Sequence, residues 1–240
     1  GDRVLFVAAS GAVYALKAAS GEVLWRRYVG HESQLHPMPL TVAGSDDVLA
    51  VDGRRHELLR LGARTNKLIW RLSLNEPLLG CKIFTDSILA VTKSGKLFLV
   101  DVEDGASRKQ VILPQALSAL PGLDEKRGRL YVASEHSNLF VLSSNSLSCD
   151  EVYYLGHKPG AVMAPPATML GLVFVTEVLN SKISRMHVLA MENTGLGLRP
   201  AQNSFRLQGH VVTPPLVMGR RLLVTTNLGA VYLFEIDKSA

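Results

Sequence analysis

The feature that most constrains the fold is a segment near the start of the chain that recurs five more times. Val13–Trp25 has the pattern of a strand, a tight turn at Ser20-Gly21 and a second strand that ends in tryptophan. Leu58–Trp70 repeats this pattern, with Asn66 in place of Gly21. Both residue types accept the left-handed backbone conformation that such a turn needs. Fainter copies begin at four further positions, and the six copies start 39 to 47 residues apart: Leu97, Leu139, Met186 and Val231.

This spacing predicts the architecture. A period of about 40–50 residues built from short strands is typical of a radial β-propeller. Each full repeat offers four strand candidates, and many of these are continuously apolar, as in Leu172–Val175. Strands that are buried on both faces between stacked sheets have this composition. The expected fold is therefore all-β, a propeller of four-stranded antiparallel blades.

The strand count predicts four complete blades and two partial ones. The first strands of three complete blades are expected at Met38–Ala43, Leu117–Leu123 and Val162–Leu170. The first set of strands begins at Val4–Ala8 without an inner strand, and the last set stops at Val231–Ile236 without an outer one. We expect a single propeller domain, or a propeller fragment, over residues 1–240. Two arrangements stay open, a six-bladed ring with two short blades and an arc of a larger ring.

Charge and hydropathy exclude two classes of partner. The chain has 26 basic and 21 acidic residues, and the basic residues lie in scattered doublets such as Arg26-Arg27 and Arg220-Arg221. Nucleic-acid binding needs a basic stripe interleaved with exposed aromatic residues. No apolar run approaches the roughly 18–20 residues that span a bilayer. We therefore expect no nucleic acid and no membrane span.

The cysteines, the histidines and one acidic turn are the candidate chemical groups. Two cysteines exclude a disulfide framework, and we expect Cys81 to be a buried free thiol and Cys149 to lie in a turn. The turn Asp101–Gly105 lacks the alternating ligands of a calcium loop. Three Gly-His pairs fall in separate loops, where we expect them to cap backbone groups rather than bind one metal: Gly30-His31, Gly156-His157 and Gly209-His210. We predict no catalytic residue, no cofactor-binding residue and no metal site.

The fifth repeat departs most from the pattern. Glu177–Arg185 interrupts it between the second and third strands, and Asn193–Gln202 interrupts it before the fourth. Because loops on a rigid scaffold carry function, this repeat is where we expect a partner to be contacted.

The repeat resembles the tryptophan-containing repeat of pyrroloquinoline-quinone-type (PQQ-like) β-propellers. In that pattern an Ala-x-Asp-x-x-Thr-Gly-x-x-x-Trp run joins the third strand to the fourth. The first copy matches it at four positions, Ala15, Ser20, Gly21 and Trp25. The second copy keeps Thr65 and Trp70, whereas the third keeps Asp101, Asp104 and Gly105 but has Lys109 in place of tryptophan. The resemblance covers nearly the whole chain and implies that Trp25 and Trp70 are buried between neighbouring blades.

The resemblance also bears on activity. In the enzymes of the family the quinone lies between a tryptophan and a disulfide of adjacent cysteines, beside a calcium ion held by Glu, Asn and Asp. Cys81 and Cys149 are far apart in the sequence, so no residue of that site carries over. The resemblance thus implies a bacterial, cofactor-free scaffold for protein partners in a periplasmic or other extracytoplasmic location. The alternatives are part of a quinone-dependent dehydrogenase and a propeller that binds a small molecule or glycan.

Overall fold

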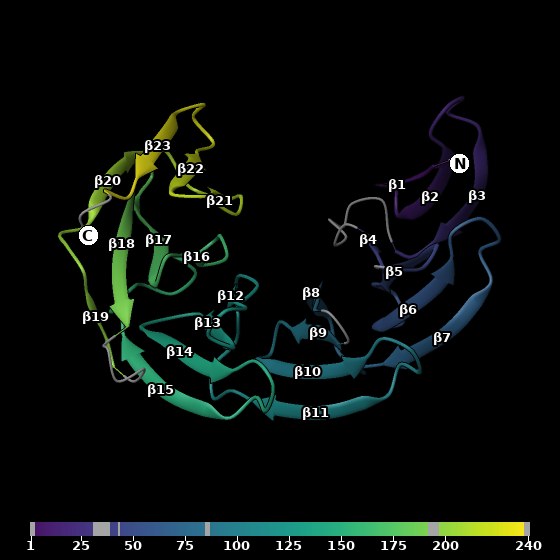
Figure 1. Cartoon of the computed structure of the whole chain (residues 1–240), viewed down its shortest axis with the longest axis horizontal. Helices are drawn as coiled ribbons and strands as arrows, with labels where there is room; N and C mark the ends of the chain where they lie inside the picture. Colours follow the sequence, from purple (N-terminus) through teal and green to yellow (C-terminus); the bar gives the residue numbers. More distant parts are fainter. Residues whose placement is uncertain (1–2, 31–38, 43, 85–86, 192–196, 238–240) are drawn as a thin grey trace. The chain divides into compact units, whose positions relative to one another are not determined.

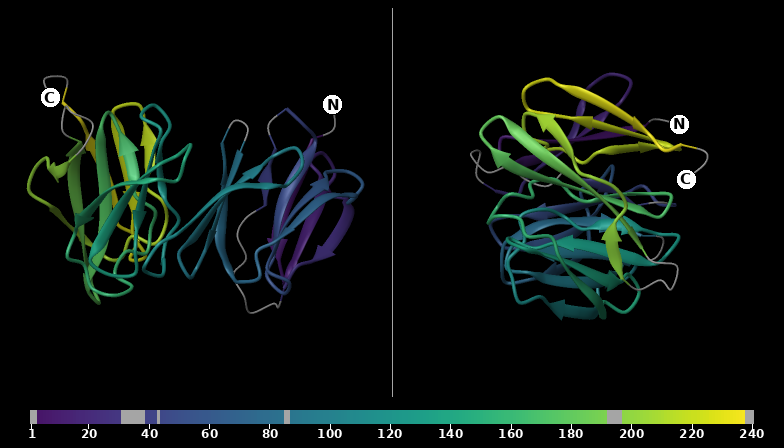
Figure 2. Two further views of the ribbon diagram at one scale, coloured as in Figure 1. Left: turned by 90° about the horizontal axis from the view of Figure 1, so that it is seen from below. Right: turned by 90° about the vertical axis from the view of Figure 1, so that its left-hand side faces the viewer.

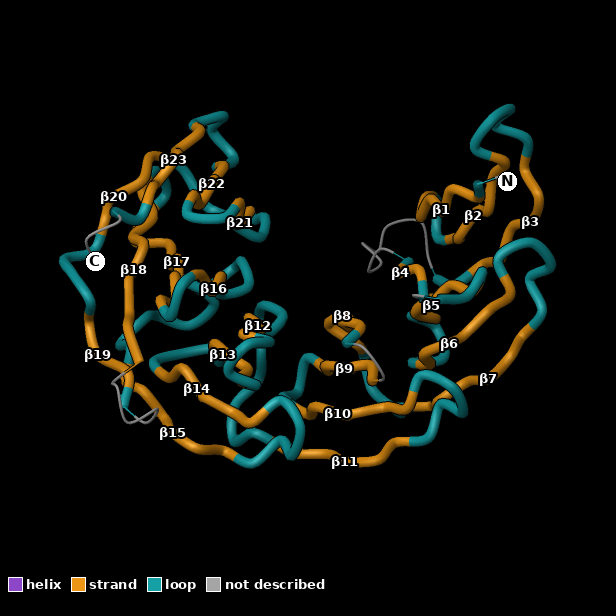
Figure 3. The backbone as a smooth tube through the Cα atoms, viewed as in Figure 1, coloured by secondary structure: helices purple, strands orange, loops and turns teal. Residues whose placement is uncertain are grey.

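The computed structural model describes residues 3–30, 39–42, 44–84, 87–191 and 197–237. Throughout these ranges the chain forms strands, turns and bends, and no helix (Figure 3). Its contacts divide it into two compact units, residues 1–112 and 113–240, which are described separately. Each unit contains three antiparallel sheets, numbered here from first to sixth in chain order (Figure 1).

Within each sheet of the first unit, every strand pairs with the next one in the chain. The first sheet consists of β1 (Val4–Ala9), β2 (Ala12–Lys17) and β3 (Val23–Tyr28). The second sheet consists of β4 (Leu40–Thr41), β5 (Asp47–Asp52), β6 (Glu57–Gly62) and β7 (Leu68–Ser73). The third sheet consists of β8 (Leu78–Ile83), β9 (Ser87–Thr92), β10 (Lys96–Asp101) and β11 (Ser107–Ile112).

The second unit follows the same plan, with one irregular sheet. The fourth sheet consists of β12 (Gly122–Asp124), β13 (Arg129–Ala133), β14 (Asn138–Ser143) and β15 (Cys149–Tyr154). The fifth consists of β16 (Ala167–Met169), β17 (Leu172–Asn180), β18 (Ile183–Met191), β19 (Leu198–Pro200) and β20 (Phe205–Gln208). The sixth consists of β21 (Leu216–Met218), β22 (Arg221–Thr225) and β23 (Val231–Glu235). In the fifth sheet the outer strand is divided, because β19 and β20 both pair with β18.

These sheets confirm the predicted all-β fold with four fuller sheets and two three-stranded ones. The three first strands predicted above are shorter than predicted. Only Leu40–Thr41 forms within Met38–Ala43, of which residues 38 and 43 lie outside the described ranges, and only Ala167–Met169 forms within Val162–Leu170. Instead of Leu117–Leu123, the strand is Gly122–Asp124, and Leu117 makes an isolated bridge with Ser134. Prolines such as Pro165-Pro166 lack the N–H that a longer ladder would need. That residues 1–240 form one domain stays a prediction. The choice between a closed six-bladed ring and an arc of a larger ring also stays open.

Two further expectations were wrong. Glu177–Arg185 is paired strand rather than an interruption, since β17 and β18 continue past the core with Glu177 opposite Arg185. The turn of this long hairpin occupies only Ser181-Lys182. Within Asn193–Gln202, residues 198–200 form β19, whereas residues 193–196 lie outside the described ranges. Cys149, expected in a turn, is the first residue of β15.

Within each unit the sheets lie face to face over apolar clusters (Figure 2). Between the first and second sheets, Trp25 and Ala15 pack with Leu59 of the neighbour. Between the fourth and fifth, Val141 packs with Leu189. Both faces of strands such as β5, β9 and β13 are buried, which is why their sequences are continuously apolar.

A shared turn joins the last two strands in each of the first four sheets. These strands correspond to the third and fourth strands of a complete repeat. In each, one turn residue has a positive φ and donates its N–H to the carbonyl that ends the third strand. These residues are Gly21 (φ 73°, 2.8 Å), Asn66 (55°, 3.0 Å), Gly105 (72°, 3.1 Å) and Leu147 (59°, 2.9 Å). The predicted left-handed turns at Gly21 and Asn66 are thus confirmed.

A β-bulge follows each of these turns, early in the fourth strand. It places one residue of each fourth strand at the same register position, called here the docking position. The four docking residues are Trp25, Trp70, Lys109 and Glu151, opposite Ala15, Arg60, Leu99 and Val141 respectively. Since a bulge re-aims the side chains beside it, these four side chains share one orientation relative to their sheets.

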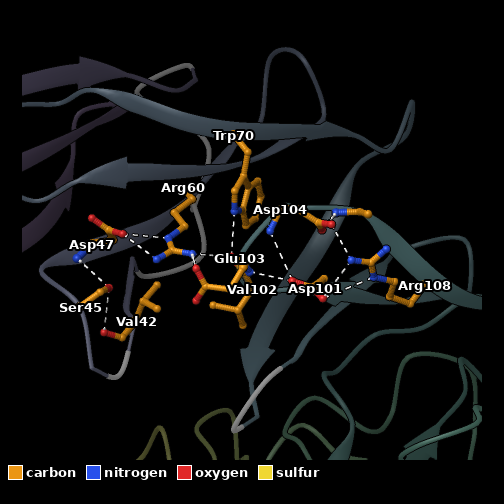
Figure 4. Close-up of polar contacts among 11 residues, drawn as sticks. Val42, Ser45, Asp47, Arg60, Trp70, Asp101, Val102, Glu103, Asp104 and Arg108 are labelled. Atoms are coloured by element: carbon orange, nitrogen blue, oxygen red, sulfur yellow. Dashed lines mark hydrogen bonds and ion pairs between the residues drawn. The ribbon is translucent and has the colours of Figure 1, made fainter.

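Both tryptophans dock on the next sheet. The indole N–H of Trp25 donates to the carbonyl of Ala63 (2.7 Å), and that of Trp70 donates to the carbonyl of Val102 (2.9 Å; Figure 4). Ala63 and Val102 are the first residues after the third strands of their sheets. The indoles are only 9% and 8% exposed, which confirms the predicted burial between sheets.

The residue at the docking position of the fourth sheet uses the opposite hydrogen-bond polarity. The carboxylate of Glu151 accepts the backbone N–H groups of Gly197 (3.1 Å) and Leu198 (2.8 Å) in the fifth sheet. A carboxylate that accepts two backbone donors therefore ties these sheets together, where elsewhere an indole donates to a carbonyl.

The contact between the second and third sheets contains a buried arginine (Figure 4). Arg60, 5% exposed, donates to the carbonyl of Val102 (2.7 Å), which also accepts from Trp70. Its guanidinium pairs with Asp47 (2.8 Å) in its own sheet and with Glu103 (3.2 Å) in the third. The buried guanidinium charge is thus compensated by a carboxylate from each of the two sheets that it joins.

Two equivalent glycines test the indole contact. A Cβ at Gly105 would lie 2.6 Å from the indole of Trp70, whereas a Cβ at Gly21 has no neighbour within 4 Å. Gly21→Ala should lower the free energy of unfolding by only about 1–2 kcal/mol, the cost of a left-handed backbone conformation for alanine. Gly105→Ala should cost about 1–3 kcal/mol more, because the indole must shift. Urea unfolding measures both variants, and equal losses would contradict the packing described.

Candidate functional site

The histidines singled out by the sequence bind backbone carbonyls separately. The Nδ1–H of the buried His157 donates to the carbonyl of Lys158 (3.1 Å), and the Nε2–H of His210 donates to that of Asn180 (2.8 Å). His31 lies outside the described residues. The prediction that these histidines cap backbone groups is confirmed for His157 and His210. Across the part of the chain that the structure describes, no three His, Cys, Asp or Glu side chains gather as metal ligands.

The acidic turn is closed by its own groups. The carboxylate of Asp101 accepts the N–H groups of Glu103 (2.8 Å) and Asp104 (3.3 Å), and Arg108 pairs with both Asp101 (3.1 Å) and Asp104 (2.5 Å). These backbone N–H groups and the Arg108 guanidinium hold the pKa of Asp101 below its usual range. The predicted hairpin turn is confirmed.

Cys81 is buried in β8, as predicted, and burial raises the pKa of its thiol to about 12. It therefore stays protonated at neutral pH and is a poor nucleophile. Cys149 is exposed at the start of β15.

The turn between β16 and β17 carries an unusual residue. Leu170 and Gly171 form a two-residue hairpin loop in which both φ angles are positive, 51° and 83°. Such loops prefer Asn-Gly, because left-handed backbone costs other residues about 1–2 kcal/mol. Leu170 is also 56% exposed, so the free chain gains little apolar burial in return. The strained conformation of Leu170 was not predicted from the sequence.

Leu170 borders a groove of about 660 Å³ in the second unit. Hairpin turns of three successive sheets line it, over residues 123–127, 168–171, 217 and 219. The side chain of Arg127 lies against Gly171, where a Cβ would be 2.5 Å from its Nη2, and it pairs with Asp124 (3.1 Å). Together with the exposed Val217, these residues present apolar side chains beside a positioned guanidinium.

The long hairpin of the fifth sheet, formed by β17 and β18, contains a buried carboxylate. Glu177, 3% exposed, accepts hydrogen bonds from Nε of Arg185 (2.6 Å) and Nε2 of His187 (2.9 Å). Burial alone would raise the pKa of Glu177, but the hydrogen bonds from His187 and Arg185 outweigh it and leave the pKa lowered. Both partners of the carboxylate hold it ionised, so it serves to fix the hairpin.

The fifth sheet thus combines a fixed polar cluster with an exposed apolar turn at the edge of the groove. Glu177, Arg185 and His187 of this sheet are engaged with one another, whereas Leu170 is exposed and its turn lies beside Arg127 of the fourth sheet. The expectation that a partner contacts this repeat stays a prediction, but Glu177–Arg185, the segment singled out from the sequence, is regular hairpin.

Residues 9–108 match the family model described as "Outer membrane protein assembly factor BamB". This stretch contains both docked tryptophans and the three turns of the first unit. The match covers the two copies of the repeat that carry tryptophan, the stretch in which the sequence resembles PQQ-like β-propellers. No curated protein sequence matches the chain significantly.

Solved structures show the same fold. BamB from Moraxella catarrhalis is 14% identical with a TM-score of 0.60, over 98% of this chain and 79% of that one. A chain of the mitotic checkpoint complex is 11% identical with a TM-score of 0.71, over 97% and 71%. The WD40 domain of Toxoplasma gondii coronin is 12% identical with a TM-score of 0.74, over 99% and 65%. The six sheets are thus blades of a β-propeller.

The residues that the structure describes include no helix that is long and apolar enough to cross a bilayer.

The buried carboxylate makes a pH-dependent prediction. Since the pKa of Glu177 is lowered by folding, its contribution to stability is present above the ordinary glutamate value of 4.5 and is lost as the pH falls below it. Glu177→Gln should lower the free energy of unfolding by about 1–3 kcal/mol at pH 7. The difference from the parent should shrink in the acid range.

Urea unfolding at pH 7 and at a series of pH values below 4.5 measures this difference. Glu125→Gln, in an exposed turn, is the control and should have little effect at any pH. A constant penalty for Glu177→Gln at all pH values would mean that the charge does not stabilise the hairpin.

Proposed function

We propose that this propeller is a non-catalytic scaffold for protein–protein interaction, and that the groove beside Leu170 binds the partner. The observation that carries the proposal is Leu170 itself. A large apolar side chain is exposed on a backbone conformation that disfavours it. Strain of this kind persists where function requires it, and a partner that covers Leu170 would recover its burial energy.

The chemistry of the groove suits a protein segment. Interfaces combine an apolar centre with a polar rim, and arginine is enriched in them. Leu170 and Val217 supply apolar surface, and Arg127 is held at its place by Asp124. A partner segment with an apolar side chain next to a carboxylate would fit this pattern.

The family match supports the same class of function. The matching family is described as an assembly factor of outer membrane proteins, and one structural neighbour is a chain of a multiprotein complex. We infer from the family match a bacterial protein outside the cytoplasm. The absence of nucleic acid among the partners remains a prediction from the scattered charge.

Site-specific photo-crosslinking in cells of the source organism tests the proposal. A photoreactive phenylalanine derivative at Leu170 should give a discrete adduct with one partner. The same residue at Leu228, which is 63% exposed in the turn between β22 and β23, is the control and should not give it. Arg127→Glu should weaken the adduct, because it reverses the charge beside the groove.

Equal labelling from Leu170 and Leu228 would contradict the proposed groove. A stoichiometric complex with pyrroloquinoline quinone and calcium, detected by ultraviolet-visible titration, would instead support the dehydrogenase alternative.

A further inference from the structure

In the second and third sheets, the face that packs against the preceding sheet is formed by the same four register positions. They pair across the second and third strands, and we call them the receiving face. In the second sheet they are Val48, Ala50, Leu59 and Leu61, and in the third sheet Ile88, Ala90, Phe98 and Val100. All eight are buried, and a docked tryptophan belongs to the cluster that covers each set, Trp25 for the first and Trp70 for the second.

The first sheet has the same receiving face without a cover in its unit. The equivalent residues are Leu5, Val7, Tyr14 and Leu16, which pair in the same register. Leu5 is 52% exposed and Val7 41% exposed, in contrast to at most 2% at the matching positions of the second sheet. An apolar face of this composition is typical of a binding surface.

The turn of the first sheet completes the docking geometry. Ala18 follows β2 as Ala63 follows β6, so its carbonyl stands at the position that accepts an indole N–H in the neighbouring sheets. Gly21 matches Gly105, against which the ring of Trp70 packs. At Gly21 the corresponding space is open, with nothing within 4 Å of an added Cβ.

We propose that the receiving face of the first sheet binds a tryptophan-bearing β-hairpin of a further propeller-type blade. Its indole would lie over Gly21 and donate to the Ala18 carbonyl. Both tryptophans of the chain are already docked on the second and third sheets, so the third comes from outside these 240 residues. The inference rests on the proposed scaffold function and names a second surface with the chemistry of its partner.

The chain itself indicates which group carries recognition. Charged side chains assist docking elsewhere, since Arg60 reaches Glu103 (3.2 Å) and Arg27 donates to the side chain of Asn66 (2.8 Å). The first sheet has Ala19 and Gly21 at the positions of Glu103 and Asn66. The first sheet therefore has no charged or amide side chain at these two positions, and we expect the indole to be the determinant.

A peptide copy of residues 57–74 provides the probe, because it carries a third strand, the turn and a fourth strand with Trp70. The full-length chain, labelled with ¹⁵N, is titrated with this peptide and with its Trp70→Ala counterpart. The tryptophan peptide should shift the Gly21 amide signal saturably, and the alanine peptide should bind at least about tenfold more weakly. Gly21→Ala in the protein should also weaken binding, because the methyl group occupies the space of the ring.

Leu5→Lys tests the apolar face and should weaken binding of the tryptophan peptide at least about tenfold. Ile112→Lys is the matched control, an exposed apolar residue at the end of β11, and should leave binding unchanged. Equal binding of the two peptides, or full binding to Leu5→Lys, would overturn the inference. Slow thiol labelling of Leu5→Cys in the free monomer would also overturn it, since the face would then be covered already.

The result is separable from the test of the proposed function. Leu170 lies in the second unit, so Leu5→Lys should leave its crosslinked adduct intact. Loss of peptide binding with a normal Leu170 adduct refutes only the inference, and loss of the adduct with normal peptide binding refutes only the groove.

Discussion

The hydrogen bond from an indole N–H to the carbonyl that follows the next sheet's third strand organises the first unit. It depends on two local features, a turn with one left-handed residue and a bulge that follows it. Together they fix the docking position, which Trp25 and Trp70 fill. Glu151 fills the same position in the second unit and reverses the polarity, accepting two backbone N–H groups. The register of the repeat is therefore kept, while the chemistry of the contact changes.

The sequence predicted the features that local rules determine. Gly21 and Asn66 predict their turns because few residue types accept a left-handed backbone conformation. Trp25 and Trp70 predict the docking contact because they occupy the same position of the repeat. The short first strands and the long hairpin were not predictable in the same way. The polar residues of Glu177–Arg185 have the composition of a loop, and only the tertiary pairing of Glu177 with Arg185 and His187 makes them strand.

The chemical groups of the chain are largely used to hold it together. Asp101 closes its own turn, Glu177 fixes a hairpin, and Cys81 is a buried thiol with a raised pKa. Exposed apolar side chains lie apart from these groups, at Leu170 and on the receiving face of the first sheet. Neither surface follows from the sequence, because Leu170 is informative only through its φ angle and Leu5 only through the burial of its equivalents in the next sheets.

Hydrogen exchange of the two indole N–H groups in the full chain tests the docking contact most directly. Both N–H groups should exchange slowly under native conditions, because each is buried and bonded to a carbonyl of the next sheet. Trp70→Phe should remove one protected signal and leave the protection of Trp25 unchanged. Exchange of either indole at the rate of a free tryptophan would contradict the account, since the docking position would then not hold the sheets together.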